Sequence, residues 1–141
     1  MILEGKLERV LSSGHERWMV VQAGEKTYTC SYVDDSEYVE EGYCEAFSIG
    51  QEVSFPVEMR YAICQAAEEG QAVGIFTDYP PTFGSYAVGR VVKKFGTRHY
   101  ELEVDDGRIL PVRLSNPSDF ADNTKIHVSG ELAAIRPLDV E

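Results

Sequence analysis

The chain has 141 residues, of which 43% are hydrophobic and 11% aromatic, and its formal net charge is −11 at pH 7. This composition is too apolar for a disordered chain and fits one compact domain, or two small domains that share a core. No run approaches the roughly 18 apolar residues that span a bilayer, and the first residues lack the pattern of a signal peptide, so we expect a cytoplasmic protein without membrane attachment.

The cysteine pattern argues against a disulfide framework and against a zinc site. Cys30, Cys44 and Cys64 are odd in number and show no Cys-x-x-Cys spacing. We therefore expect buried thiols in a reducing compartment, with no metal and no cofactor.

The first half of the chain predicts β-strands, because apolar residues alternate with polar ones and turn residues recur roughly every eight to twelve positions. The predicted strands cover residues 2–11, 17–23, 26–33, 52–61 and 72–76. The segment Ala23-Gly24-Glu25 predicts a tight reversal between the second and third of them. In the fourth strand, alternation places four apolar side chains on one face: Val53, Phe55, Val57 and Met59.

Two segments interrupt this pattern. Residues 34–48 form an acidic loop with no sustained apolar face. Residues 77–85 contain Pro80, Pro81 and Gly84, which disfavour a central strand and indicate a connection between two units. We expect units at residues 1–78 and 85–141, joined by a Pro- and Gly-containing connection at 79–84.

The second half repeats the pattern of the first, with predicted strands at 85–95, 99–105, 108–114 and 125–134 and a hairpin at Asp106-Gly107. Three matches suggest a duplicated strand meander. They are Gly5-Lys6-Leu7 with Gly89-Arg90-Val91, Trp18-Met19-Val20 with Tyr100-Glu101-Leu102, and the Gly24 turn with the Gly107 turn. The second half has no obvious fifth strand, so it must borrow one, stay partly open, or use residues 132–138 after a bend at Gly130. The predicted class is all-β with little helix: two small barrels in tandem, or one fused barrel or sandwich.

Part of the first half resembles the cold-shock domains of the OB-fold group. Residues 49–57, Ile-Gly-Gln-Glu-Val-Ser-Phe-Pro-Val, and 69–73, Glu-Gly-Gln-Ala-Val, are similar to the last two strands of that family, and Gly5-Lys6-Leu7 is similar to its first strand. The resemblance covers roughly residues 1–78 and implies an OB-like barrel that binds single-stranded nucleic acid. The stacking motifs of the family are degraded here, and Trp18, Tyr28 and Tyr32 are the aromatic residues that remain at those positions.

A basic and aromatic segment in the second half is the best candidate for contact with nucleic acid. Its Lys and Arg side chains would neutralise phosphates while an aromatic ring stacks on a base. A charged hairpin tip whose cations offset nearby carboxylates is the alternative. The candidate nucleic-acid-binding residues are Arg90, Lys93, Lys94, Arg98, His99 and Tyr100, with Trp18 and Tyr28 secondary, although Trp18 also suits the core.

The acidic first half supports a second hypothesis, that of a protein-interaction module that meets a basic partner. The candidate partner-binding residues are Asp34, Asp35, Glu37, Glu40, Glu41 and Glu45, which a solvated loop would explain equally well. The three histidines are scattered, and no nucleophile elbow, phosphate-cradling loop or metal-binding pair occurs. The sequence therefore favours a binding module over an enzyme.

Overall fold

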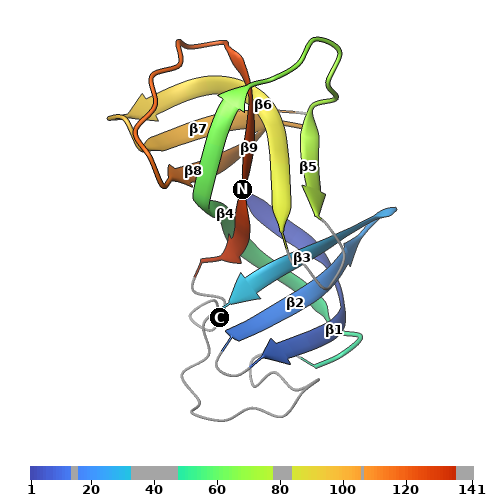
Figure 1. Cartoon of the computed structure of the whole chain (residues 1–141). Coiled ribbons are helices and arrows are strands. Elements are labelled where there is room, and N and C mark those ends of the chain that lie inside the picture. Colours follow the sequence, from blue (N-terminus) through green and yellow to red (C-terminus); the bar gives the residue numbers. More distant parts are fainter. Residues whose placement is uncertain (14–15, 33–47, 78–83, 106, 136–141) are drawn as a thin grey trace. The chain divides into compact units, whose positions relative to one another are not determined.

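The computed structural model describes residues 1–13, 16–32, 48–77, 84–105 and 107–135 (Figure 1). Within these ranges the chain forms strands and turns and contains no helix. The strands are β1 (Ile2–Ser13), β2 (Glu16–Ala23), β3 (Lys26–Tyr32), β4 (Glu52–Ala66), β5 (Gly74–Thr77), β6 (Ser85–Phe95), β7 (His99–Val104), β8 (Arg108–Leu114) and β9 (Lys125–Ala134). The predicted all-β class with little helix is confirmed.

The chain divides into two compact units that are not consecutive in sequence. The β1–β3 unit comprises Ile2–Val57 and the end of the chain from Ala133, whereas the β6–β8 unit comprises Met1 and Glu58–Leu132. The long strands β4 and β9 each contribute one part to each unit. Of the predicted connection at 79–84, only Gly84 lies among the described residues, and the division into units at 1–78 and 85–141 stays a prediction.

In the β1–β3 unit the strands follow the order β1-β2-β3-β9-β4, and β4 pairs again with β1. The pairs β1–β2, β2–β3 and β1–β4 are antiparallel, while β3 meets the end of β9 in parallel at Ser31 and Ala133. The predicted reversal at Gly24 is confirmed, since Ala23 pairs with Lys26 and Gly24 has a φ of 65°. The order of pairing therefore returns to its first strand, as in a small barrel.

The β6–β8 unit has the same order of pairing, β6-β7-β8-β4-β9, and β9 pairs again with β6. Its fifth strand is the second part of β4, which pairs in parallel with β8 through Met59 and Val112. The unit therefore borrows its fifth strand, which was one of the three possibilities that the sequence left open. The short strand β5 adds an edge by pairing antiparallel with β6.

Local geometry supports the predicted repeat. Gly5 and Gly89 each lie so close to a backbone carbonyl of the next strand, at Gln22 and Glu103 respectively, that a Cβ atom would collide with it. Two residues after each glycine the register shifts by one, between Leu7 and Arg9 in β1 and between Val91 and Lys93 in β6. The two first strands are thus bent by bulges at equivalent positions.

The registers correct one detail of the repeat. Leu7 pairs with Val21, and the equivalent Val91 pairs with Leu102. Continuing from these pairs, Met19 rather than Trp18 is equivalent to Tyr100. The proposed match of the second strands is therefore displaced by one residue, because Trp18, Met19, Val20 and Val21 are all buried and alternation does not fix the alignment of β2.

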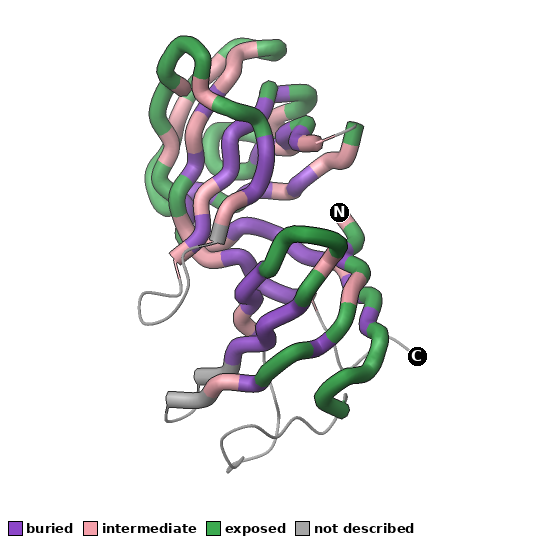
Figure 2. The backbone as a smooth tube through the Cα atoms, turned by 90° about the vertical axis from the view of Figure 1, so that its right-hand side faces the viewer, coloured by how far each residue is buried: buried purple, intermediate pink, exposed green. Residues whose placement is uncertain are grey.

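Each unit has an apolar interior made of alternate strand residues (Figure 2). In β4 the predicted inward face is confirmed, since Val53, Phe55, Val57 and Met59 are all buried. Trp18 is also buried, in agreement with its interpretation as a core residue. Among the described residues, no helix is long and apolar enough to cross a membrane.

The buried thiol of Cys30 provides a prediction about pH. Burial raises the pKa of Cys30 far above its ordinary value of 9.0, so the folded state keeps the proton while the unfolded state loses it above about pH 9. Stability should therefore fall by up to about 1.4 kcal/mol per pH unit above that point. Urea unfolding of wild type and Cys30→Ala at about pH 8, 9 and 10 should show a steeper loss for wild type. Cys64→Ala, at a half-buried position, is the control and should keep the wild-type slope; equal slopes for all three proteins would contradict the prediction.

Candidate functional site

The candidate site lies within the β6–β8 unit, beside a bulge in β4. Met59 pairs with Val112 and Ala62 with Leu114, so β4 contains one more residue than β8 between these pairs. Odd-numbered residues of β4 are buried as far as Met59, whereas after the bulge Ala62 is buried instead. Tyr61 is consequently 73% exposed. Tyr61 has a φ of 53°, in the left-handed region that a bulky residue rarely adopts. Such strain persists where the surrounding structure enforces it, and it is frequent at functional sites.

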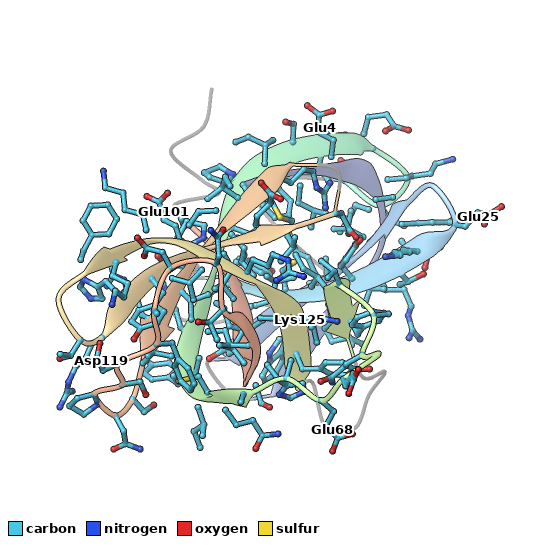
Figure 3. All side chains as sticks on the ribbon, turned by 90° about the horizontal axis from the view of Figure 1, so that it is seen from above. Glu4, Glu25, Glu68, Glu101, Asp119 and Lys125 are labelled. Atoms are coloured by element: carbon cyan, nitrogen blue, oxygen red, sulfur yellow. The ribbon has the colours of Figure 1, made fainter. Side chains whose placement is uncertain are left out.

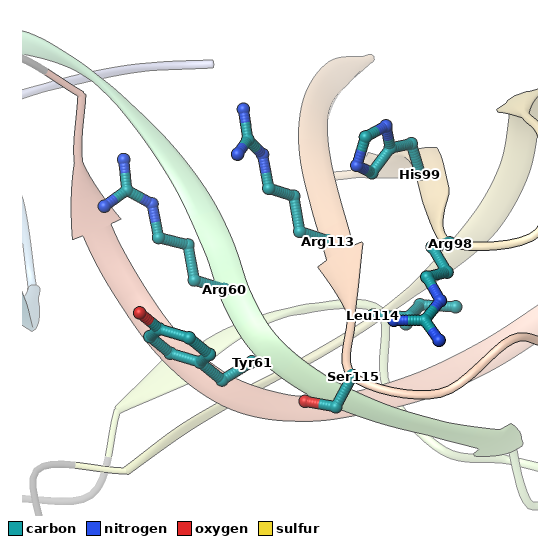
Figure 4. Close-up of a pocket in the computed structure, with 7 residues that line it drawn as sticks. All are labelled: Arg60, Tyr61, Arg98, His99, Arg113, Leu114 and Ser115. Atoms are coloured by element: carbon teal, nitrogen blue, oxygen red, sulfur yellow. The ribbon is translucent and has the colours of Figure 1, made fainter.

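A pocket of about 610 Å³ opens beside this bulge (Figure 4). It is lined by Arg60, Tyr61, Arg98, His99, Arg113, Leu114 and Ser115. Figure 4 shows Arg60, Arg113 and His99 extending from neighbouring strands on one side of the sheet. Three arginines line this pocket and make it a positive site in a chain whose net charge is strongly negative, although Arg98 extends toward Leu114 and not alongside Arg60 and Arg113 (Figure 4).

Glu58 holds two of these arginines. Its side chain is only 7% exposed, and its two carboxylate oxygens divide between two guanidinium groups. Oε1 accepts a hydrogen bond from Nε of Arg60, and Oε2 lies 3.4 Å from Nε of Arg113. This buried carboxylate therefore links β4 to β8 and fixes the positions of two pocket side chains.

The rim of the pocket is fixed by backbone hydrogen bonds. The amide of Leu114 donates to the carbonyl of Arg98 at 2.8 Å, and the amide of Ser115 donates to the carbonyl of Ala62 at 2.8 Å. The hydroxyl of Tyr100 supports the adjoining loop, because it donates to the carbonyl of Ser118 at 2.7 Å and accepts from the amide of Phe120 at 3.0 Å. Hydrogen bonds thus connect the strands and the loop around the pocket.

An exposed aromatic and basic row runs from the pocket across the sheet. Phe95 on β6 pairs with His99 on β7, which pairs with Arg113 on β8, so the three side chains share one face. Phe95 is 51% exposed, and the Lys93 ammonium lies 4.8 Å from the centre of its ring. The outer face of β6, β7, β8 and β4 therefore combines rings with cations, although it also contains Glu101 opposite Lys93.

The residues of the predicted basic segment lie in different environments. Arg98 and His99 line the pocket, and Lys93 lies on the same outer face as His99. Lys94 instead forms an ion pair with Asp119, at 3.4 Å between Nζ and Oδ1. Arg90 donates a hydrogen bond to the carbonyl of Asn123 at 3.1 Å.

The predicted aromatic contacts are not exposed. Tyr100 is 1% exposed, with its hydroxyl engaged as described above, so its ring has no free face for a base. Trp18 and Tyr28 belong to the β1–β3 unit and are both buried there. The exposed rings of the site are instead Tyr61 and Phe95.

Arg60, Tyr61 and Arg113 were not among the residues predicted from the sequence. The hairpin predicted at Asp106-Gly107 would not have located Arg113 correctly: a two-residue turn there places Arg113 opposite Tyr100, whereas Val104 pairs with Arg108 and Arg113 pairs with His99. The six candidate partner-binding residues of the acidic loop all lie outside the described residues: Asp34, Asp35, Glu37, Glu40, Glu41 and Glu45.

Comparison with known proteins adds no assignment: no protein-family model matches the chain, and no curated protein matches it. Within the described ranges, no three His, Cys, Asp or Glu side chains gather into a group that could hold a metal ion. The geometry of the basic pocket and the aromatic row is therefore the basis for a functional proposal.

Proposed function

We propose that this chain is a non-enzymatic binding module for single-stranded nucleic acid, such as RNA, in the cytoplasm. The strand would lie over the outer face of β6, β7, β8 and β4. The observation that carries the proposal is the continuous row from Phe95 through His99 to the arginine pocket, which places exposed rings beside cations. Single-strand binders use this combination, with cations at phosphates and rings under bases.

The order of strands supports an OB-like assignment of both units. Each unit closes five strands in the same order. Each also has one parallel pair at the equivalent place, β3 with β9 in the β1–β3 unit and β8 with β4 in the β6–β8 unit. Five-stranded barrels of the OB type bind oligonucleotides on the face of their second and third strands, which correspond to β7 and β8 here. His99 on β7 and Arg113 on β8 occupy that face.

The negative net charge of the chain argues against binding to nucleic acid, but the charge at the pocket is positive. The chain as a whole repels phosphate, whereas the pocket contains three arginines against one buried carboxylate. Repulsion between exposed charges fades beyond about 8 Å at physiological ionic strength, so the local site decides the sign of the field at contact. Binding is therefore expected to be salt-sensitive and to involve only a short stretch of the nucleic-acid strand.

Fluorescence anisotropy of a labelled oligouridylate of about ten nucleotides tests the proposal at low and moderate salt. Lys93→Glu should weaken binding at least about tenfold, because it reverses a charge beside the Phe95 ring. Lys6→Glu is the matched control: it makes the same charge change at an exposed position of the β1–β3 unit and should alter affinity by less than about threefold.

No binding at low salt would overturn the proposal. The search would then turn to a basic protein that meets the acidic surface, where residues such as Glu25 extend from the β2–β3 turn into solvent (Figure 3). Equal weakening by Lys93→Glu and Lys6→Glu would show that only net charge matters, and that the proposed face is not the site.

A further inference from the structure

The arginine pocket carries more positive charge than one internal phosphate of a strand requires. Arg60, Arg98 and Arg113 supply three cations, and Glu58 supplies the carboxylate that contacts two of them, which leaves a formal charge of plus two. A phosphodiester within a strand has a single negative charge. A phosphate monoester has a charge of about −1.5 to −2 at pH 7, together with three acceptor oxygens.

The way Glu58 holds the arginines also suits a monoester. Its two oxygens contact the Nε atoms of Arg60 and Arg113, and among the described residues these are the only hydrogen bonds or ion pairs of the two guanidinium groups. The outer nitrogens of both groups remain for a ligand. Paired nitrogens in a fixed fork match the oxygens of phosphate, and bonds of this kind between charged groups are the stronger class.

A ring stands next to this anion site. Tyr61 lines the same pocket and is 73% exposed, and its backbone conformation is one that a tyrosine adopts at a cost. Exposed aromatic rings beside cations stack nucleobases. The pair of a phosphate fork and a stacking ring fits a nucleotide that carries its phosphate at a free end.

We propose that the pocket of the β6–β8 unit binds the terminal phosphate monoester of a single strand, with Arg60 and Arg113 as the phosphate fork, Arg98 as a third cation and Tyr61 under the terminal base. Glu58 is a positioning residue, since it acts through the two arginines. This inference rests on the proposed function and assigns an end preference to that same site.

The test compares oligouridylates of one length that carry a 5′-phosphate, a 3′-phosphate or hydroxyls at both ends, with the label on the end opposite the phosphate. One phosphorylated strand should bind the intact protein about tenfold to a hundredfold more tightly than the hydroxyl strand. A hydroxyl strand one nucleotide longer controls for added charge and should gain less than about threefold. The end that shows the preference identifies the orientation of the strand.

Variants separate the pocket from the rest of the face. Arg113→Lys keeps the charge opposite Glu58 but removes one of the two guanidinium groups of the fork, and it should reduce the preference for phosphate to less than about threefold. Lys93→Gln should weaken phosphorylated and hydroxyl strands alike, because Lys93 does not line the pocket. Glu58→Gln adds net positive charge, so a loss of preference in that variant would reveal positioning rather than general electrostatics.

Equal affinity for the three strands would overturn this inference while the proposed function stands. Failure of every strand to bind would remove the proposed function and the end preference together. A phosphoserine peptide serves as a further probe: tighter binding of that peptide than of either phosphorylated strand would overturn the assignment to a nucleic-acid end.

Discussion

Gly89→Ala is expected to lower the free energy of unfolding by about 2 to 3 kcal/mol. A Cβ atom at this position would lie 2.5 Å from the carbonyl oxygen of Glu103 and 3.0 Å from Cγ1 of Val104. The oxygen belongs to the backbone of β7, so the clash can be relieved only by moving the strands apart. Alanine reduces the entropy of the unfolded chain by an amount worth about 0.4 to 1 kcal/mol, which is too little to offset this cost.

Urea unfolding followed by circular dichroism measures the effect. Gly84→Ala is the matched control, because nothing lies within 4 Å of an added Cβ there and its backbone is not in the left-handed region; its effect should stay within about 0.5 kcal/mol. Gly5→Ala should behave like Gly89→Ala, since Gly5 approaches the carbonyl of Gln22 in the equivalent position. A Gly89→Ala protein as stable as Gly84→Ala would contradict the proposed close approach.

These two glycines show why part of the repeat could be predicted from the sequence. Each of these glycines begins a similar tripeptide, so Gly5-Lys6-Leu7 and Gly89-Arg90-Val91 can be matched in the sequence. The bulges that follow them depend on the partner strand. In the second strands the four consecutive residues 18–21 are all buried, so alternation does not fix the alignment, and the match of Trp18 with Tyr100 was wrong by one residue.

Strand positions were predictable wherever alternation is unbroken. The predicted segments 85–95, 108–114 and 125–134 agree with β6, β8 and β9. The predicted fourth strand ended at residue 61, whereas β4 continues to Ala66. The reason is the bulge at Tyr61, which changes the inward side of the strand and makes the pattern of residues 58–63 read as irregular. The strands β4 and β9 each contribute to both units and pair there with strands far away in the sequence, which no local pattern predicts.

The candidate site was half predictable for the same reason. Arg98 and His99 are neighbours in a segment whose composition alone suggested an anion site. Arg60 and Tyr61 reach the pocket from β4, whose pairing with β8 links distant parts of the chain. The burial of Tyr100 could not be predicted, because its hydroxyl has partners in the loop of residues 118–120, which have no recognisable sequence signature.

Replacing the two arginines that contact Glu58, in Arg60→Gln/Arg113→Gln, is expected to cost about 3 to 5 kcal/mol of stability. Glu58 is 7% exposed, whereas Arg60 and Arg113 are 32% and 61% exposed. Water reaches the arginines and screens their attraction to Glu58, so the ion pairs themselves contribute little. The large cost arises because a buried carboxylate without a cation is far less stable than the same group in water.

This asymmetry predicts a rescue. Adding Glu58→Gln to the double variant removes the buried charge and should restore at least about half of the lost stability, whereas Glu58→Gln alone should cost about 1 kcal/mol, because the freed guanidinium groups can be hydrated. Urea unfolding of the four proteins measures this cycle. A double variant that loses less than about 1 kcal/mol, or a triple variant no more stable than the double, would show that Glu58 is not held by these arginines. If the rescue occurs, the arginines that are proposed to bind phosphate also neutralise a buried charge of the fold, so the fold itself requires cations at the mouth of this pocket.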